Sequence, residues 1–223
     1  MEHAFGSRVA FAAPVNLKNT ADREACWIES LENGWLFLIS SGEGRGALLS
    51  VGAHPDVLLG RSCLTVRQIH EFREKASQFP AYPRLASPLC GDGWLACGSA
   101  AMGFDPICGD GTAHAIREAI LATAVIRACE HAPLTQPLFA HYEARLTAAF
   151  RRHIALCREF YRSGSAGMWW ESELHSLEHG LEWCDARLGR ATNFRYKLVG
   201  LDLQPADPDF TATGRSDHER LEA

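Results

Sequence analysis

The residues with the clearest chemical potential lie in one glycine-punctuated stretch near the middle of the chain. Gly109, Asp110 and Gly111 are followed by Thr112 and Ala113, and a nearly all-apolar helical pattern starts there. Backbone N–H groups at the start of a helix have no partner inside the helix, and glycine lets another group approach them closely. This stretch therefore predicts a site for an anion or a carbonyl oxygen, although glycines in such loops also serve turns alone.

Cysteine and histidine are numerous, but their spacing does not indicate a metal site. No CxxC, HxH or HExxH pattern occurs, and His175 with His179 has no third ligand nearby in the sequence. Most of the cysteines lie in apolar patterns, which predicts buried free thiols. The eight are Cys26, Cys63, Cys90, Cys97, Cys108, Cys129, Cys157 and Cys184.

Two aromatic groups could line a pocket for a flat substrate. Trp35 and Phe37 lie in "GWLFLIS", and Trp169 and Trp170 follow a glycine-rich turn. Period-two alternation equally makes Trp35, Phe37 and Ile39 the inward face of a strand. Trp169 and Trp170 equally suit a core anchor, because aromatic side chains dominate protein cores.

Composition limits the class of protein. The 223 residues are 47% hydrophobic and 22% charged, with a formal net charge of −5 and scattered Lys and Arg, so no basic stripe for nucleic acid is present. No apolar run reaches the roughly 18 to 20 residues that cross a bilayer, and the first residues lack the pattern of a signal peptide. We expect a cytoplasmic protein with no nucleic-acid or membrane partner.

The elements that must position these residues change along the chain. Residues 1–52 contain short β-type runs that predict an antiparallel sheet of about four strands. Within it, "WIESLENGWLFLIS" predicts a hairpin with positive φ at Asn33 and Gly34, and "GEGRG" at 42–46 predicts a second hairpin turn.

Helical patterns follow the predicted sheet. Apolar residues at three- and four-residue intervals predict an amphipathic helix over 64–79, ended by Pro80. After a short strand at 94–98, further helices are expected over 113–130 and 137–162, and a third carries apolar residues from 174 to 188. The polar residues beyond 204 are expected to form a frayed tail.

The order of these features resembles a known family. "GSAAMGFDPICGDGTAHAI" and the helices after it resemble the second flavin-contacting motif of FAD-dependent monooxygenases, and more closely flavin-dependent halogenases and geranylgeranyl-reductase-like enzymes. The resemblance implies that Gly98 and Ser99 lie by the ribityl and phosphate part of FAD. It also implies that Asp105, Pro106, Gly109, Asp110, Gly111, Thr112 and Ala113 lie by the isoalloxazine.

The chain departs from the family pattern at several points. Ser99 stands where the family usually has Asp, and no GxGxxG element for the ADP half of FAD occurs in the sequence. Trp35 and Phe37 match only part of the WxWxIP motif of the halogenases, and the family's lysine cannot be assigned here. We therefore name no catalytic residue.

We conclude that the chain is α+β, with an antiparallel substrate-domain sheet, a fragment of an FAD-binding Rossmann-like domain and C-terminal helices. The expected parts are 1–80, 81–131, 132–204 and a flexible tail at 205–223. The resemblance implies an FAD-dependent oxidoreductase of the monooxygenase or halogenase-like type, acting on an aromatic or carrier-bound small molecule, with an N-terminal FAD-binding half or a flavin reductase as a further partner.

Two alternatives stay open. The chain could be a non-catalytic remnant or a partner subunit that completes its fold with a separate N-terminal half. By resemblance "WLAC" belongs in a parallel sheet, and its missing neighbours would leave apolar surface uncovered. In the second alternative, the chain is an α+β domain in which the glycine loop only makes a turn.

Overall fold

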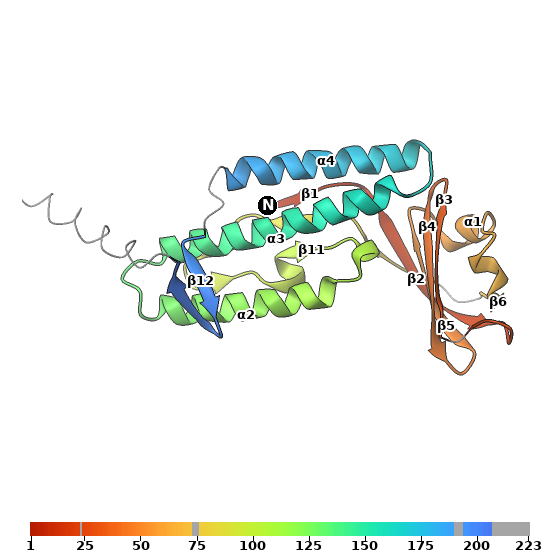
Figure 1. Cartoon of the computed structure of the whole chain (residues 1–223), viewed down its shortest axis with the longest axis horizontal. Coiled ribbons are helices and arrows are strands. Elements are labelled where there is room, and N and C mark those ends of the chain that lie inside the picture. Colours follow the sequence, from red (N-terminus) through yellow and green to blue (C-terminus); the bar gives the residue numbers. More distant parts are fainter. Residues whose placement is uncertain (23, 73–75, 190–193, 207–223) are drawn as a thin grey trace, which may run out of the picture.

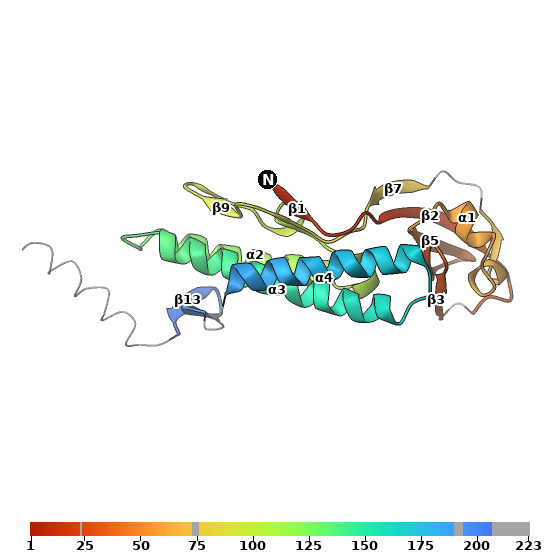
Figure 2. The same ribbon diagram turned by 90° about the horizontal axis from the view of Figure 1, so that it is seen from above.

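The computed structural model describes residues 1–22, 24–72, 76–189 and 194–206. Three long helices lie side by side, and a large antiparallel sheet stands at one end of them (Figure 1). The view from above shows a thin layer of short strands over the helices (Figure 2). The predicted α+β fold is confirmed. Within the described ranges, no helix has both the length and the apolar character needed to cross a membrane.

The large sheet contains the strands expected in residues 1–52 and two more. β2 (Val9–Leu17), β3 (Cys26–Leu31), β4 (Gly34–Gly42), β5 (Arg45–Val51) and β6 (Ile69–Glu71) are arranged in the order β3-β4-β5-β2-β6, and β7 (Ser77–Pro80) also pairs with β2. All of these pairings are antiparallel.

Both predicted hairpins are present. At the first turn Gly34 has φ 145°, and a Cβ atom there would lie 2.0 Å from the Val51 carbonyl oxygen, so only glycine fits. The prediction of positive φ at Asn33 was wrong, because the close approach to the neighbouring strand requires it only at Gly34. At "GEGRG" three successive residues have positive φ, namely Gly42, Glu43 and Gly44.

The sheet is covered on both faces, which explains why β4 has an almost continuous apolar sequence. Trp35 and Val51 face the long helices. Leu36 and Leu38 face the opposite side, where Leu58 of the short helix α1 (Pro55–Leu59) packs on them. Alternate residues of one strand thus contribute to two separate cores.

The helix predicted over 64–79 is wrong. A single 3-10 turn, η1 (Thr65–Arg67), is followed by β6 and β7, and residues 73–75 lie outside the described part. Glu29 accepts the backbone N–H groups of Cys63, Leu64 and Thr65 at 2.7, 3.0 and 2.9 Å. These bonds cap the start of the turn, and the residues after it pair with the open edge of β2, which outweighs the helical spacing.

The three long helices match the sequence prediction closely. They are α2 (Gly111–Cys129), α3 (Gln136–Arg162) and α4 (Met168–Leu188). Tyr142, Phe150 and Ile154 of α3 are buried in the core between the helices. Gly180 of α4 allows a close approach there, because a Cβ atom would lie 2.9 Å from the Phe5 ring.

In the described part of the chain, short strands form three small sheets beside the helices. β1 (Glu2–Ala4), β8 (Arg84–Ala86) and β11 (Met102–Gly103) form one small sheet, β9 (Cys90–Gly91) and β10 (Trp94–Leu95) form a hairpin, and so do β12 (Tyr196–Val199) and β13 (Asp202–Pro205). The β12–β13 hairpin lies on the side opposite β1 and β9 (Figure 2). The strand expected at 94–98 is thus only two residues long and antiparallel, because β9 is the neighbour available to it. Pro205 belongs to β13 rather than to a tail, and residues 207–223 lie outside the described part.

Candidate functional site

The loop between β11 and α2 has a well-defined local structure. Pro106, Ile107 and Cys108 form a 3-10 turn, η3 (Pro106–Cys108), whose N-terminus is capped by Asp105: its Oδ1 atom accepts the Ile107 N–H at 2.9 Å. Gly109 then takes the left-handed conformation with φ 65°, and α2 starts at Gly111. The aspartate cap, the proline and the glycine together set the direction in which the loop enters the helix.

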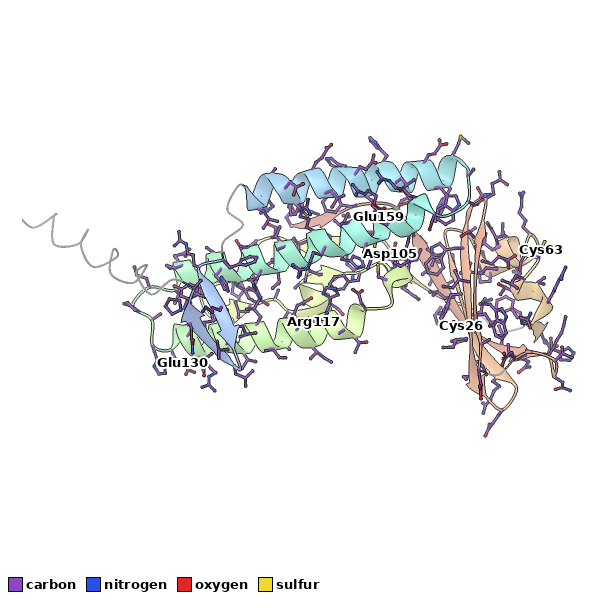
Figure 3. The ribbon with its side chains drawn as sticks, viewed as in Figure 1. Cys26, Cys63, Asp105, Arg117, Glu130 and Glu159 are labelled. Atoms are coloured by element: carbon purple, nitrogen blue, oxygen red, sulfur yellow. The ribbon has the colours of Figure 1, made fainter. Side chains whose placement is uncertain are left out.

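Asp105 anchors this loop to the protein interior. Its side chain is buried, with the residue 1% exposed, and its Oδ2 atom lies 2.7 Å from Arg8 Nε and accepts the Tyr161 hydroxyl at 2.9 Å. Figure 3 places Asp105 where the helices meet the large sheet. Burial raises the pKa of Asp105, and Arg8 together with the hydrogen bonds from Ile107 and Tyr161 opposes that shift.

Arg8 joins the loop to α4. Its Nη1 atom bonds Glu173 Oε2, and Glu173 Oε1 also accepts the N–H and the hydroxyl of Ser7 at 3.3 and 3.1 Å. The side chains of Arg8 and Glu173 are both buried. We call Arg8, Asp105, Tyr161 and Glu173 the buried clamp. It ties the loop to residues 7–8, to α3 and to α4.

Trp35 reaches the clamp from the large sheet. It is 2% exposed, and its Nε1 atom donates to the Tyr161 hydroxyl at 3.3 Å. Phe37 is partly buried against the same core, whereas Ile39 is exposed, so the inward face of β4 ends at Phe37. Trp170 is a core anchor as one interpretation expected, and its Nε1 atom donates to the Leu31 carbonyl at 2.7 Å.

The other predicted cofactor residues surround an open surface. Ser99, Gly109, Gly111 and Thr112 are exposed, and Gly98, Pro106, Asp110 and Ala113 are partly buried. A Cβ atom added to Gly98, Gly109 or Gly111 would meet no atom within 4 Å. The Gly98 N–H donates to Glu118 Oε2 at 2.7 Å, which brings the 3-10 turn η2 (Gly98–Ala100) against α2.

The start of α2 has donors without acceptors. Asp110 does not cap the helix, because its Oδ2 atom lies 2.8 Å from His114 Nε2 instead. Among the residues described, none accepts the N–H groups of Gly111, Thr112 or Ala113. These donors and the dipole of a 19-residue helix make the open side of the loop suited to a negatively charged group or a carbonyl oxygen.

His153 of α3 is a site residue that the sequence analysis missed. Its Nε2 atom accepts the Asp105 N–H at 2.9 Å, which requires the proton of the neutral ring to be on Nδ1. Burial lowers the pKa of His153 to about 4, against the opposing effect of Asp110. Nδ1 lies 3.7 Å from Asp110 Oδ1. Nothing in the spacing of the sequence could relate position 153 to the loop.

In the residues that the structure describes, two side-chain groups come close enough to hold a cation, and both contain His153. One is Cys108, His153 and Cys157, and the other is Asp110, His114 and His153. Binding at Nε2 would break the bond from Asp105, and binding at Nδ1 would displace the ring proton. The tautomer of His153 therefore opposes a metal in either group.

The prediction that the cysteines are mostly buried is wrong for part of the set. Cys90, Cys157 and Cys184 are buried, but Cys26, Cys63 and Cys97 are exposed, and Cys108 and Cys129 are intermediate. The exposed ones lie at a strand, a loop and the start of η2, where the apolar pattern does not correspond to a core-facing side. Cys108 Sγ and Cys157 Sγ lie 3.5 Å apart beside the loop.

A cavity of about 580 Å³ lies between α2 and α3 and begins at the loop. Its polar wall includes Asp110, His114, Glu118 and His153. Burial raises the pKa of Glu118 to about 7, in spite of the hydrogen bond from Gly98. The remaining lining residues are Arg117, Ile120, Leu121, Arg145, Leu146, Ala149, Arg152, Leu156 and Leu198.

Comparison with known proteins gives structural neighbours only. No model of a protein family and no curated protein matches the chain. The peptidyl tryptophan dihydroxylase QhpG superposes with a TM-score of 0.64 at 18% identity, over 92% of this chain and 52% of that chain. The flavin-dependent halogenase CmlS gives 0.64 at 16%, over 99% and 45%, and the myxobacterial chondrochloren halogenase CndH gives 0.65 at 16%, over 87% and 53%.

These neighbours establish the fold. The chain spans about half the length of each of the three proteins. The resemblance predicted from the loop and from the helices that follow it is therefore confirmed for the fold.

Proposed function

Because the chain has the fold of about half of a flavin-dependent halogenase or monooxygenase, we propose that it works in FAD-dependent oxidation of a small molecule. The reaction is of the monooxygenase or halogenase-like type, and the substrate is aromatic or carrier-bound. This chain supplies the loop beside the isoalloxazine and the sheet on the substrate side. The ADP half of FAD is held by residues other than those at 1–223.

The observation that carries this proposal is the open start of α2 held by the buried clamp. Free N–H groups at Gly111, Thr112 and Ala113 face a surface where Gly98, Gly109 and Gly111 leave room for a planar group. When bound, the flavin supplies the electron transfer. The chain's part is to stabilise negative charge on the ring through the helix start and to keep the loop from moving.

The predicted substrate residues have a different part in this proposal. Trp35 is enclosed and donates to Tyr161, so it acts on the loop through the clamp rather than by touching a substrate. Phe37 is partly buried on the same face. We therefore treat Trp35 as a positioning residue.

The alternative, a non-catalytic partner that completes its fold with another polypeptide, is favoured by one observation. α2 exposes a stripe at helical spacing, in which Ile116 and Ile126 are 58% and 51% exposed. A helix face of this kind is normally covered. Thr112, Ala119 and Thr123 complete the stripe.

An FAD titration tests the proposal. The purified chain is titrated with FAD, alone and together with the product of the upstream coding region, and flavin absorbance and fluorescence are followed. Saturable binding in either titration supports the proposal. Binding only in the presence of the upstream product makes the chain half of a split flavoenzyme. If FAD binds in neither arm, the proposal is wrong and a non-catalytic remnant remains.

A further inference from the structure

The cavity between α2 and α3 carries a positive charge that the described part of the chain does not neutralise. Arg117 of α2 and Arg145 and Arg152 of α3 line it, and none of the three has a carboxylate partner among the described residues. Figure 3 marks Arg117 on α2. Arg145 and Arg152 are seven residues apart on α3, which places them about two turns, or roughly 10 Å, from each other along one face.

Arg145 is more than a solvated surface residue. Arg145 is partly buried and lies over the Phe194 ring, with its Cζ atom 4.5 Å from the ring centre, whereas Arg152 and Arg117 are exposed. Burial lowers the pKa of Arg145, and the positive charge of Arg152 lowers it further. Two like charges that line one cavity, one of them on a partly desolvated side chain, favour an anion between them.

The acidic groups on the same wall do not supply that anion. Asp110 lies against His114, with 2.8 Å between Oδ2 and Nε2. Glu118 accepts the Gly98 N–H, and its pKa of about 7 leaves it partly protonated at neutral pH.

The cavity also has unsatisfied polar atoms that point to a ligand. Asp110 Oδ1, Glu118 Oε1 and His153 Nδ1 are buried, line the cavity and have no hydrogen-bond partner among the described residues. Asp110 Oδ1 requires a donor and the His153 Nδ1–H group requires an acceptor, whereas Glu118 Oε1 accepts when the carboxyl is ionised and donates when it is protonated. A group that both donates and accepts, such as a hydroxyl, satisfies all three.

From these observations we propose that the cavity binds an organic phosphate that carries hydroxyl groups. Arg145 and Arg152 bind the phosphate, with Arg117 at the rim, and Asp110, Glu118 and His153 bind the hydroxyls. The phosphate belongs either to a phosphorylated substrate or to the flavin cofactor, and in the second case this chain holds the phosphate next to the ribityl group while the rest of the ADP half is held elsewhere. This site does not depend on the proposed function, because the arginines and the unsatisfied atoms are features of this chain alone.

Calorimetric titration of the full chain at low salt tests the proposal with three probes: ribose 5-phosphate, FMN and riboflavin. We expect the two phosphates to bind and the affinity to fall as salt is added. If FMN binds more tightly than both ribose 5-phosphate and riboflavin, the phosphate is that of the flavin. If ribose 5-phosphate binds at least as tightly as FMN, it is that of a substrate. If neither phosphate binds, the proposal is wrong.

Two sets of substitutions test whether Arg145 and Arg152 bind the phosphate. The double variant Arg145→Gln/Arg152→Gln should lose at least tenfold in phosphate affinity. Arg151→Gln is the matched control, because Arg151 lies on the same helix but pairs with Asp185 of α4, with 3.2 Å between Nη2 and Oδ2. Equal affinity in a double variant that retains its helix content by circular dichroism would overturn the proposal. FAD binding that survives the double substitution would overturn this site for the cofactor without affecting the flavin loop.

Discussion

Arg8 Nε lies 2.7 Å from Asp105 Oδ2, and both side chains are completely buried although 97 positions separate them in the sequence. This pair connects the start of the large sheet to the loop that opens α2. The loop carries the open glycines and the free N–H groups. The position of the candidate cofactor site therefore depends on an ion pair that is buried beneath the loop and does not line the site.

Asp105→Asn should destabilise the chain by about 3 kcal/mol or more. Tyr161 donates to one carboxylate oxygen, which also pairs with Arg8, and Ile107 donates to the other, so the NH₂ group of an amide would face a donor or a cation in either orientation. The free energy of unfolding is measured in urea. Asp185→Asn is the control, since its ion pair with Arg151 is exposed and should change stability by at most about 1 kcal/mol. Equal effects of the two substitutions would contradict the anchoring role of Asp105.

Glu118→Gln should remove a pH dependence of stability between about pH 4.5 and 7. Burial raises the folded-state pKa of Glu118 to about 7, so the folded chain holds a proton that the unfolded chain has released. Stability of the native chain therefore falls as the pH rises through this window and levels off above it, by at most on the order of 3 kcal/mol. The melting temperatures of the native chain and of Glu118→Gln, measured across pH 4.5 to 8, report this difference in stability. Parallel curves would show that Glu118 is ionised throughout.

Glu29→Gln should remove part of the stability loss in acid. Desolvation opposes ionisation, but hydrogen bonds from Ser62, Thr65, Cys63 and Leu64 lower the pKa of Glu29 to about 2. The ionised group stabilises the fold above the unfolded pKa near 4.5, and this contribution is lost as the pH falls toward 2.

The Glu29 prediction is checked by acid unfolding followed by circular dichroism. At pH 7 the variant should be less stable by about 1 to 3 kcal/mol. Glu32→Gln, on the same hairpin, changes only an exposed pair with Arg61 and should behave like the native chain. An acid unfolding curve for Glu29→Gln that matches the native one would contradict the prediction.

Gly111→Val should abolish flavin binding and leave the helix content nearly unchanged. A Cβ atom at Gly111 meets no protein atom within 4 Å, so the side chain would project into the open space where we propose that the flavin binds. FAD titration and circular dichroism measure the two effects, under whichever condition supports binding by the native chain. If the variant binds FAD with the affinity of the native chain, this loop is not part of the cofactor site.

Local signals determined much of the fold. The alternation of β3 to β5, the glycines of their turns and the apolar spacing of α2, α3 and α4 predict those elements within a few residues, because each depends on neighbours in the chain. The loop at 105–113 was also found from sequence, since its proline and glycines set its own backbone. The helix predicted over 64–79 failed, because its residues are held by Glu29 and β2 from elsewhere.

Only the tertiary structure decided what the candidate site contains. Asp105 was expected beside a ligand, but contacts with Arg8 and Tyr161 place its carboxylate in the interior. His153 and Arg152 reach the site because α3 packs antiparallel against α2, and only that packing decides which residues of α3 lie beside the loop. Burial then determined the charge of Glu118 and the tautomer of His153. Residue types and spacing specify local backbone structure, whereas proximity, desolvation and protonation arise only when distant segments pack together.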